Sequence, residues 1–116
     1  MTIYIDDMRM LARVGNLEAR WSHLMTDGPT EELLAFALRL GMRPEWIQKP
    51  GTAQEHFDLT DPKRQLALRL GARAIQYGAE GVALMNAKRE GRAFDLDAFR
   101  AAHPDDEGTA EQMDLF

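Results

Sequence analysis

Two histidines and a few aspartates stand where the ends of β-strands are expected. Asp6 closes an apolar run, His23 opens another, and His56 and Asp58 flank one position of a later run. Residues two apart on a strand point to the same face, so His56 and Asp58 can converge on one ion or substrate. Carboxylates with imidazoles would suit Mg²⁺ or Mn²⁺, or a harder zinc site, and such an ion could activate water against a phosphodiester. The sequence therefore predicts a metal site from Asp6, His23, His56 and Asp58, the last three of them catalytic.

Plainer interpretations of the same residues stay open. Asp6 and Asp7 are adjacent, so they point to opposite faces of a strand and at most one of them faces the site. His23 stands beside the Trp21 region and would also serve as a hydrogen-bonded structural histidine. Asp58 would also serve as a turn residue. The pattern alone does not decide between chemistry and structure.

Basic residues that could hold a phosphate accompany these groups. Lys63 and Arg64 stand at the expected start of a helix, whose amino terminus itself attracts anions. Arg20, with Arg9 and Arg13, could clamp phosphate oxygens. We therefore predict a phosphate-binding role for Lys63, Arg64 and Arg20.

The last five residues of the sequence form a second motif. They read Gln112, Met113, Asp114, Leu115 and Phe116. This string resembles the peptide with which many bacterial replication and repair proteins bind the DNA polymerase sliding clamp. The resemblance implies that Leu115 and Phe116 enter an apolar pocket while the Gln112 amide makes hydrogen bonds at its rim. The implied partner is a bacterial sliding clamp, with any contact to DNA indirect.

The charges set this motif in a separate acidic tail. The chain has 19 Asp and Glu against 14 Lys and Arg. Five of the acids lie beyond His103, where there is no base: Asp105, Asp106, Glu107, Glu111 and Asp114. The rest of the chain is balanced, so the net charge of −5 belongs to this tail. Low apolar content, Pro104 and Gly108 predict a solvated linker that carries a docking peptide.

The body of the chain repeats itself. The string Ala-Leu-Arg-Leu-Gly occurs at residues 37–41 and again at residues 67–71, each time as the expected end of a helix with a terminating glycine. A short strand precedes each helix, and a β-prone run follows at residues 45–48 and 73–77. The pattern predicts two strand-helix-strand units between about residues 22 and 77, with both helices on one face of the sheet as in the ferredoxin-like arrangement.

Further elements complete the predicted α+β or α/β fold. A strand at residues 2–5 would bring the sheet to four or five strands, as an addition or as its central strand. Helices are expected at residues 79–90 and 96–102, the second begun by Asp95. We divide the chain into an α/β domain (1–78), a helical extension (79–102) and the acidic tail (103–116).

Composition limits the classes of protein to which the chain can belong. It has 116 residues, enough for one modest core, and no cysteine, which excludes disulfides and thiolate zinc sites and suits the cytoplasm. No apolar run approaches membrane-spanning length. Phosphate-binding and dinucleotide-binding glycine loops are absent from the sequence, which argues against a kinase or a dehydrogenase.

Several short strings in the body resemble a known family. They are Ile3-Tyr4-Ile5-Asp6-Asp7, Arg20-Trp21-Ser22-His23-Leu24, Trp46-Ile47-Gln48, His56-Phe57-Asp58 and Leu70-Gly71-Ala72. In this order they resemble domain of unknown function family 4031, which occurs in bacteria and phages. The resemblance covers about residues 2 to 77 and implies no established activity.

Three functions remain open from the sequence. The first is a sliding-clamp-binding accessory protein of DNA replication or repair, which in a phage version would modulate the host clamp. The second is a small metal-dependent nuclease or phosphoesterase that the tail recruits to DNA. The third is a non-catalytic binder of a small phosphorylated ligand. The balanced charge of the body favours the first, because nucleases generally present a basic track to their substrate.

Overall fold

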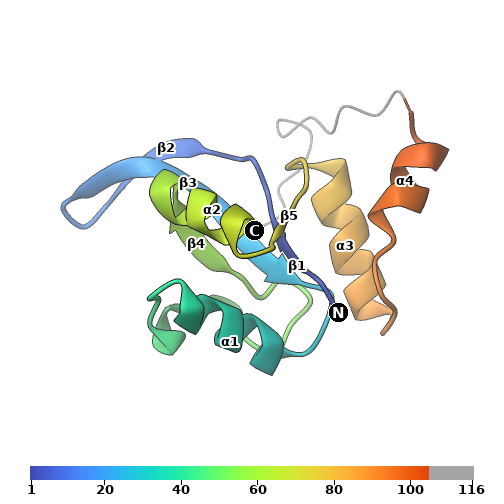
Figure 1. The fold of residues 1–116 in the computed structure, drawn as a ribbon, viewed down its shortest axis with the longest axis horizontal. Helices are drawn as coiled ribbons and strands as arrows, with labels where there is room; N and C mark the ends of the chain where they lie inside the picture. The colour runs from blue at the N-terminus through green and yellow to red at the C-terminus, as the bar shows by residue number, and fades with distance from the viewer. Residues whose placement is uncertain (105–116) are drawn as a thin grey trace.

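A mixed five-stranded sheet lies between two pairs of helices in the computed structural model, which describes residues 1–104 (Figure 1). The strands are β1 (Ile3–Ile5), β2 (Met10–Val14), β3 (Leu17–Thr26), β4 (Phe57–Thr60) and β5 (Arg73–Ala74). The helices are α1 (Thr30–Arg39), α2 (Asp61–Arg69), α3 (Ala79–Arg89) and α4 (Leu96–Ala102), with a 3₁₀ turn at Pro44–Trp46. The predicted α+β class, with a small sheet and C-terminal helices, is confirmed.

The long strand β3 organises the sheet. Residues 17–21 of β3 pair with β2 and residues 24–26 pair with β1, both antiparallel and along the same edge of β3. β4 pairs antiparallel with the opposite edge of β3. The short strand β5 runs parallel to β1. Residues 17–20 of β3 have no pairing with β4, so they form with β2 a two-stranded arm that extends from the sheet (Figure 1).

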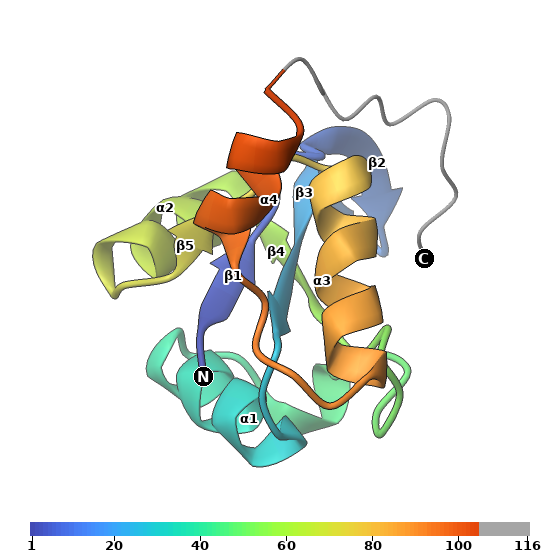
Figure 2. The ribbon, with the colours of Figure 1, turned by 90° about the vertical axis from the view of Figure 1, so that its right-hand side faces the viewer.

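The alternation of side chains along the strands builds two cores. Ile5, Leu24 and Phe57 point to one face and pack with residues of α1 and α2, such as Leu33 and Ala67. Tyr4 and Met25 point to the other face and pack with residues of α3 and α4, among them Leu84 and Leu96. Figure 2 shows α2 and α3 on opposite sides of the sheet. The prediction that the first two helices share a face is therefore confirmed.

Two local expectations need correction. Residues 45–48 do not form a strand, because Pro44–Trp46 turns as a 3₁₀ helix and only Gln48 makes an isolated bridge, to His56. The hairpin of β2 and β3 was not expected. It depends on Gly15, whose φ of +61° suits the first position of a two-residue hairpin turn.

The repeated string ends two helices, as predicted. α1 stops at Arg39 and α2 at Arg69, and Gly41 and Gly71 follow with φ of +77° and +106°. The last helix starts at Asp95, whose side chain accepts a hydrogen bond from the Ala98 N–H at 2.9 Å. Within residues 1–104, we find no helix with the length and apolar character needed to span a membrane.

Candidate metal centre

The candidate site lies beside a break in the pairing along one edge of β3, between the residues that pair with β1 and those that pair with β2. Ile5 pairs with Leu24 and Met10 with Trp21, so residues 6–9 of one chain segment lie opposite only residues 22–23 of the other. Arg9 absorbs the extra length in the left-handed region, with φ of +46°. The backbone N–H of Arg9 then bonds to the Ser22 hydroxyl instead of a strand partner, at 3.1 Å. The break exposes polar backbone groups that need other partners.

The Asp6 carboxylate supplies those partners. Its Oδ1 accepts hydrogen bonds from the backbone N–H groups of His23 and Met8, at 2.9 and 3.2 Å. Its Oδ2 lies 2.6 Å from Nδ1 of the His23 ring. Asp6 is fully buried, and its carbonyl accepts from Nε of Arg64 at 2.8 Å. One carboxylate thus closes the strand break and fixes the orientation of a neighbouring imidazole.

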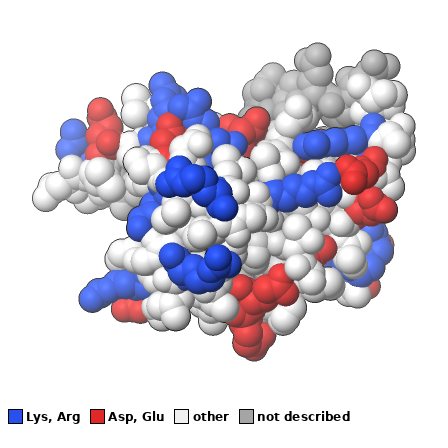
Figure 3. Space-filling model, viewed as in Figure 1, with Lys and Arg blue, Asp and Glu red and all other residues white. Residues whose placement is uncertain are grey.

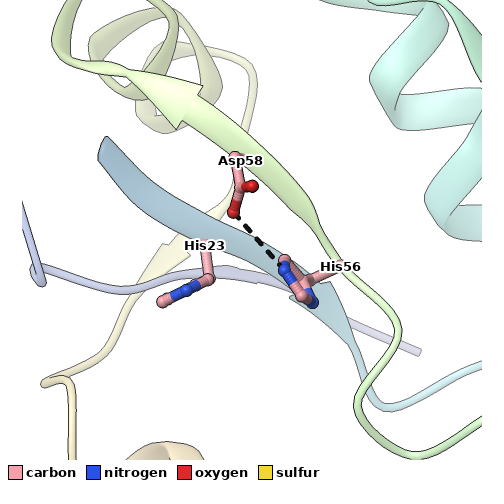
Figure 4. A group of neighbouring side chains, drawn as sticks. All are labelled: His23, His56 and Asp58. Atoms are coloured by element: carbon pink, nitrogen blue, oxygen red, sulfur yellow. Dashed lines mark ion pairs between the residues drawn. The ribbon is translucent and has the colours of Figure 1, made fainter. Parts of the chain in front are cut away.

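Three side chains converge beside this break. His23 on β3 lies directly opposite Asp58 on β4, and His56 precedes Asp58 by two residues on the same face of the sheet. One potential ligand atom from each of the three lies within 4.8 Å of the others. Figure 4 shows His56 and Asp58 facing each other, with Nε2 and Oδ1 3.4 Å apart. We refer to His23, His56 and Asp58 as the trio.

The protonation of His56 follows from its second contact. Nδ1 of His56 lies 2.8 Å from the Gln54 carbonyl oxygen, which can only accept, so Nδ1 carries a proton. In a neutral ring, Nε2 would then turn a lone pair toward the Asp58 carboxylate. A metal cation between these two atoms would be contacted by both the nitrogen and the carboxylate oxygen.

Asp58 is set to remain ionised. Burial by itself raises the pKa of its carboxyl, but the hydrogen bond and charge of His56 and the charge of His23 bring that pKa below its ordinary value. The Gln48 side chain donates to Asp58 Oδ2 at 2.7 Å. This contact turns Oδ1 toward the histidines, where it is available as an anionic ligand.

The trio offers a donor set that could hold a transition-metal ion. Each histidine has Nδ1 in contact with an oxygen, from Asp6 or from the Gln54 carbonyl, so that coordination would use the other ring nitrogen, Nε2. A histidine ligand held through its second nitrogen is the usual arrangement in metal proteins. Two imidazoles and one carboxylate suit Zn²⁺, Fe²⁺ or Mn²⁺ better than Mg²⁺, which prefers oxygen ligands and water.

The comparisons with known proteins give one match. A family described as protein of unknown function (DUF4031) matches residues 3–88. The chain belongs to this family. No curated protein and no solved structure matches the chain. The matched segment of the DUF4031 chain contains Asp6 and the whole trio, so the candidate centre lies within the family's domain.

The basic residues predicted to bind phosphate serve other contacts in this DUF4031 domain. Lys63 donates to the Leu40 carbonyl at the end of α1, and Arg64 donates to the Asp6 carbonyl. Arg20 donates to the Arg9 carbonyl at 3.1 Å. Arg64 and Arg20 therefore support the backbone around the strand break, and Lys63 supports the carboxyl end of α1. Asp6, which was predicted as a metal ligand, contacts His23 of the trio and holds the His23 ring in place.

Sequence reasoning missed three residues that shape the site. Gln48 and Gln54 position the trio, and Tyr77 stacks on the His23 ring with centroids 5.7 Å apart and planes at 20°. Tyr77 is held in turn by Asp7, whose Oδ1 accepts the Tyr77 N–H at 2.7 Å. Asp7 thus has the separate structural role expected for one member of the pair. Nothing in the local sequence singles out these contacts, because all but that of Gln54 join distant segments.

The trio opens to the surface through a shallow depression. This hollow has a volume of about 440 Å³, and its lining includes His23, His56, Asp58, Trp21 and Lys49. Both histidines are buried, while the Asp58 side chain keeps 35 % of its surface exposed. A small ligand can therefore reach the ligand atoms of the trio from one side.

Proposed function

We propose that the DUF4031 domain binds a divalent transition-metal cation through His23, His56 and Asp58 and hydrolyses a phosphoester there. The observation that carries the proposal is the orientation of the two histidines. Asp6 and the Gln54 carbonyl contact the two Nδ1 atoms, and one ring nitrogen of each histidine lies within 4.8 Å of an oxygen of the Asp58 carboxylate. Buried histidines that serve packing alone do not need such convergent orientation.

Each protein group then has a defined part in the reaction. His23 and His56 would hold the cation through ring nitrogens, and Asp58 would hold it through Oδ1 while Gln48 bonds to its other oxygen. Three protein ligands leave coordination positions for a water and a phosphoryl oxygen. The cation would lower the pKa of that water and polarise the phosphoryl group. Lys49, on the rim of the hollow, adds a positive charge on the side from which the substrate enters.

Hydrolysis of bis(p-nitrophenyl) phosphate in the presence of Mn²⁺ or Zn²⁺ tests this proposal. We expect turnover that EDTA abolishes and that falls at least about a hundredfold in Asp58→Asn, since removal of a charged ligand is costly. The third histidine of the chain, His103, lies on α4's carboxyl side and is exposed, so His103→Ala is the matched control and should keep full activity. Metal binding without any turnover would favour the non-catalytic binder of a phosphorylated ligand.

A second function is supported by the tail sequence. We propose that Gln112–Phe116 binds a bacterial sliding clamp and brings the domain to DNA during replication or repair, or lets a phage-encoded version modulate the clamp. These residues lie outside the part of the chain that the structure describes, and the support is the match of each position to the clamp-binding pattern. Calorimetric titration into purified clamp tests it.

The variants for that titration follow from the motif. A Leu115→Ala, Phe116→Ala double variant should lose binding, because these side chains would fill the apolar pocket. Glu111→Ala, one residue before the motif, should bind as the parent does. Equal affinity of the double variant and the parent would remove the clamp from the list of partners.

A further inference from the structure

The hollow at the trio continues into a larger groove. A second depression of about 670 Å³ adjoins it, and both are lined by Val14, Trp21, Gln48 and Asp58. Because these four residues are shared, the two depressions form one continuous groove that ends at the trio. We name it the arm groove, since one wall is the hairpin arm of β2 and β3.

The arm presents an uncharged face to this groove. Three cross-strand pairs share the face that continues toward His23: Met10 with Trp21, Ala12 with Ala19, and Val14 with Leu17. Met10, Val14 and Leu17 are each more than half exposed. The pairs on the other face, Leu11 with Arg20 and Arg13 with Glu18, carry the arm's charges. Large exposed apolar side chains beside a candidate reaction centre mark a binding surface.

The opposite wall is fixed to the trio. It comes from the 3₁₀ turn and the residues after it, where Trp46 is 51 % exposed. Gln48 anchors this wall, with two backbone hydrogen bonds to His56 and a side-chain bond to Asp58. The groove therefore has an indole on each side, Trp21 from β3 and Trp46 from the turn, at a fixed position relative to the ligand atoms.

We propose that the arm groove holds unpaired bases of a single-stranded nucleic acid and so places a phosphodiester at the trio; this rests on the proposed function. Bases have flat apolar faces that stack on indoles, and the two tryptophans of the chain both line the groove. Lys49 lines the part near the trio and offers a cation to a phosphate there, while Lys63 and Glu45 both line the wider part.

The same observations favour duplex DNA less than a single strand as the ligand of the arm groove. A duplex offers charged backbone on its outside and hides the faces of its bases, so it needs a continuous basic track. Basic side chains stand in separate small groups among acidic and uncharged ones on the face seen in Figure 3, and residues 1–104 contain equal numbers of acids and bases. The uncharged wall of the arm suits exposed bases instead.

Fluorescence anisotropy of a dye-labelled oligothymidylate of about twelve nucleotides tests the inference, since such a length exceeds one stacking site. The titration is done in EDTA, so that binding is measured apart from metal and cleavage. We expect saturable binding that Trp46→Ala weakens about tenfold or more and that Trp46→Phe partly restores. A blunt duplex of the same length should bind more weakly than the single strand.

Leu38→Ala is the control, because Leu38 is an exposed apolar residue, 69 % exposed, on α1. The affinity of Leu38→Ala for the oligonucleotide should equal that of the parent protein. Circular dichroism should show that Trp46→Ala and Leu38→Ala are both folded. Absence of oligonucleotide binding, an unchanged affinity in Trp46→Ala, or tighter binding of the duplex would overturn the inference. Oligonucleotide binding without hydrolysis in any metal would contradict the proposed function and leave this inference standing.

Discussion

At the scale of single residues, the site depends on a carboxylate that does not itself belong to the trio. Asp6 satisfies two backbone N–H groups at the strand break and one ring nitrogen of His23. The same contacts therefore stabilise the sheet edge and set the direction in which the imidazole faces. Metal affinity and local stability should for this reason be linked through Asp6.

Asp6→Asn should separate the charge of this residue from its shape. We expect metal affinity to fall about 10- to 100-fold, because the negative acceptor behind His23 is lost. The unfolding free energy should fall by about 1–3 kcal/mol, since a buried charged hydrogen-bond acceptor is removed. Calorimetry and chemical denaturation measure the two effects. Asp7→Asn is the matched control, because an amide oxygen still accepts the Tyr77 N–H; equal loss in both variants would refute the role of Asp6.

Much of this site could be predicted from spacing alone. The two-residue period of a strand was enough to place His56 and Asp58 on one face. His23 was expected to open a strand, but it lies inside β3 (Leu17–Thr26), and only the register of β3 with β4 brings it opposite Asp58. The roles of Gln48 and Tyr77 could not be predicted from the sequence. Gln48 acts through an isolated bridge to His56 outside the named strands, and Tyr77 acts through a ring contact with His23, which is far from it in the sequence.

At the scale of elements, Glu55 joins three segments behind the site. Its carboxylate is buried and accepts hydrogen bonds from the Thr30 hydroxyl at the start of α1 and from the Gly51 N–H. It also pairs with Lys88 of α3, with Nζ and Oε2 2.6 Å apart. The loop that carries His56 is thus tied to a helix on each face of the sheet.

Glu55→Gln should therefore destabilise the fold by about 3 kcal/mol at neutral pH, because it leaves the Lys88 ammonium without its buried counter-charge. Burial alone would raise the pKa of Glu55, but the bonds from Lys88, Thr30 and Gly51 place it below its ordinary 4.5. A lowered folded-state pKa means that this stabilisation is complete above pH 4.5 and is lost as the pH falls toward the folded value.

Urea denaturation of both proteins across that pH range measures the effect. The difference in unfolding free energy between the parent and Glu55→Gln should shrink as the pH drops below 4.5. A difference that stays constant from neutral to acid pH would show that the ionised carboxylate does not contribute.

The elements that sequence reasoning placed well are those with local signals. The last residue of each copy of the repeated string, Gly41 or Gly71, marked the end of a helix, and Asp95 capped the start of another. The hairpin was missed because most of its residues are exposed, so the usual alternation of buried and exposed side chains is absent. The strand expected at residues 45–48 failed because Pro44 begins a 3₁₀ turn.

At the scale of the whole molecule, the order of the strands could not be derived from the sequence. β3 pairs with three other strands, and β1 pairs in parallel with β5 across about seventy residues of sequence. Such pairings are decided by how two helical layers cover one sheet. The arm groove follows from that order, because it lies where β3 extends beyond β4.

The acidic tail should act independently of this body. Its composition has too little apolar content to contribute to a core. We expect removal of residues 105–116 to leave the melting temperature and the metal affinity unchanged while clamp binding is lost. Differential scanning calorimetry and the clamp titration measure this; a large drop in melting temperature would show that the tail is part of the fold.

The most direct test of the metal centre is calorimetric titration of Mn²⁺ and Zn²⁺ into the purified protein at neutral pH. The geometry predicts one site per chain and loss of that site in His56→Ala and Asp58→Ala. His103→Ala should bind as the parent does. No saturable binding of either metal, or equal binding by the parent and the His56→Ala variant, would contradict the proposed function.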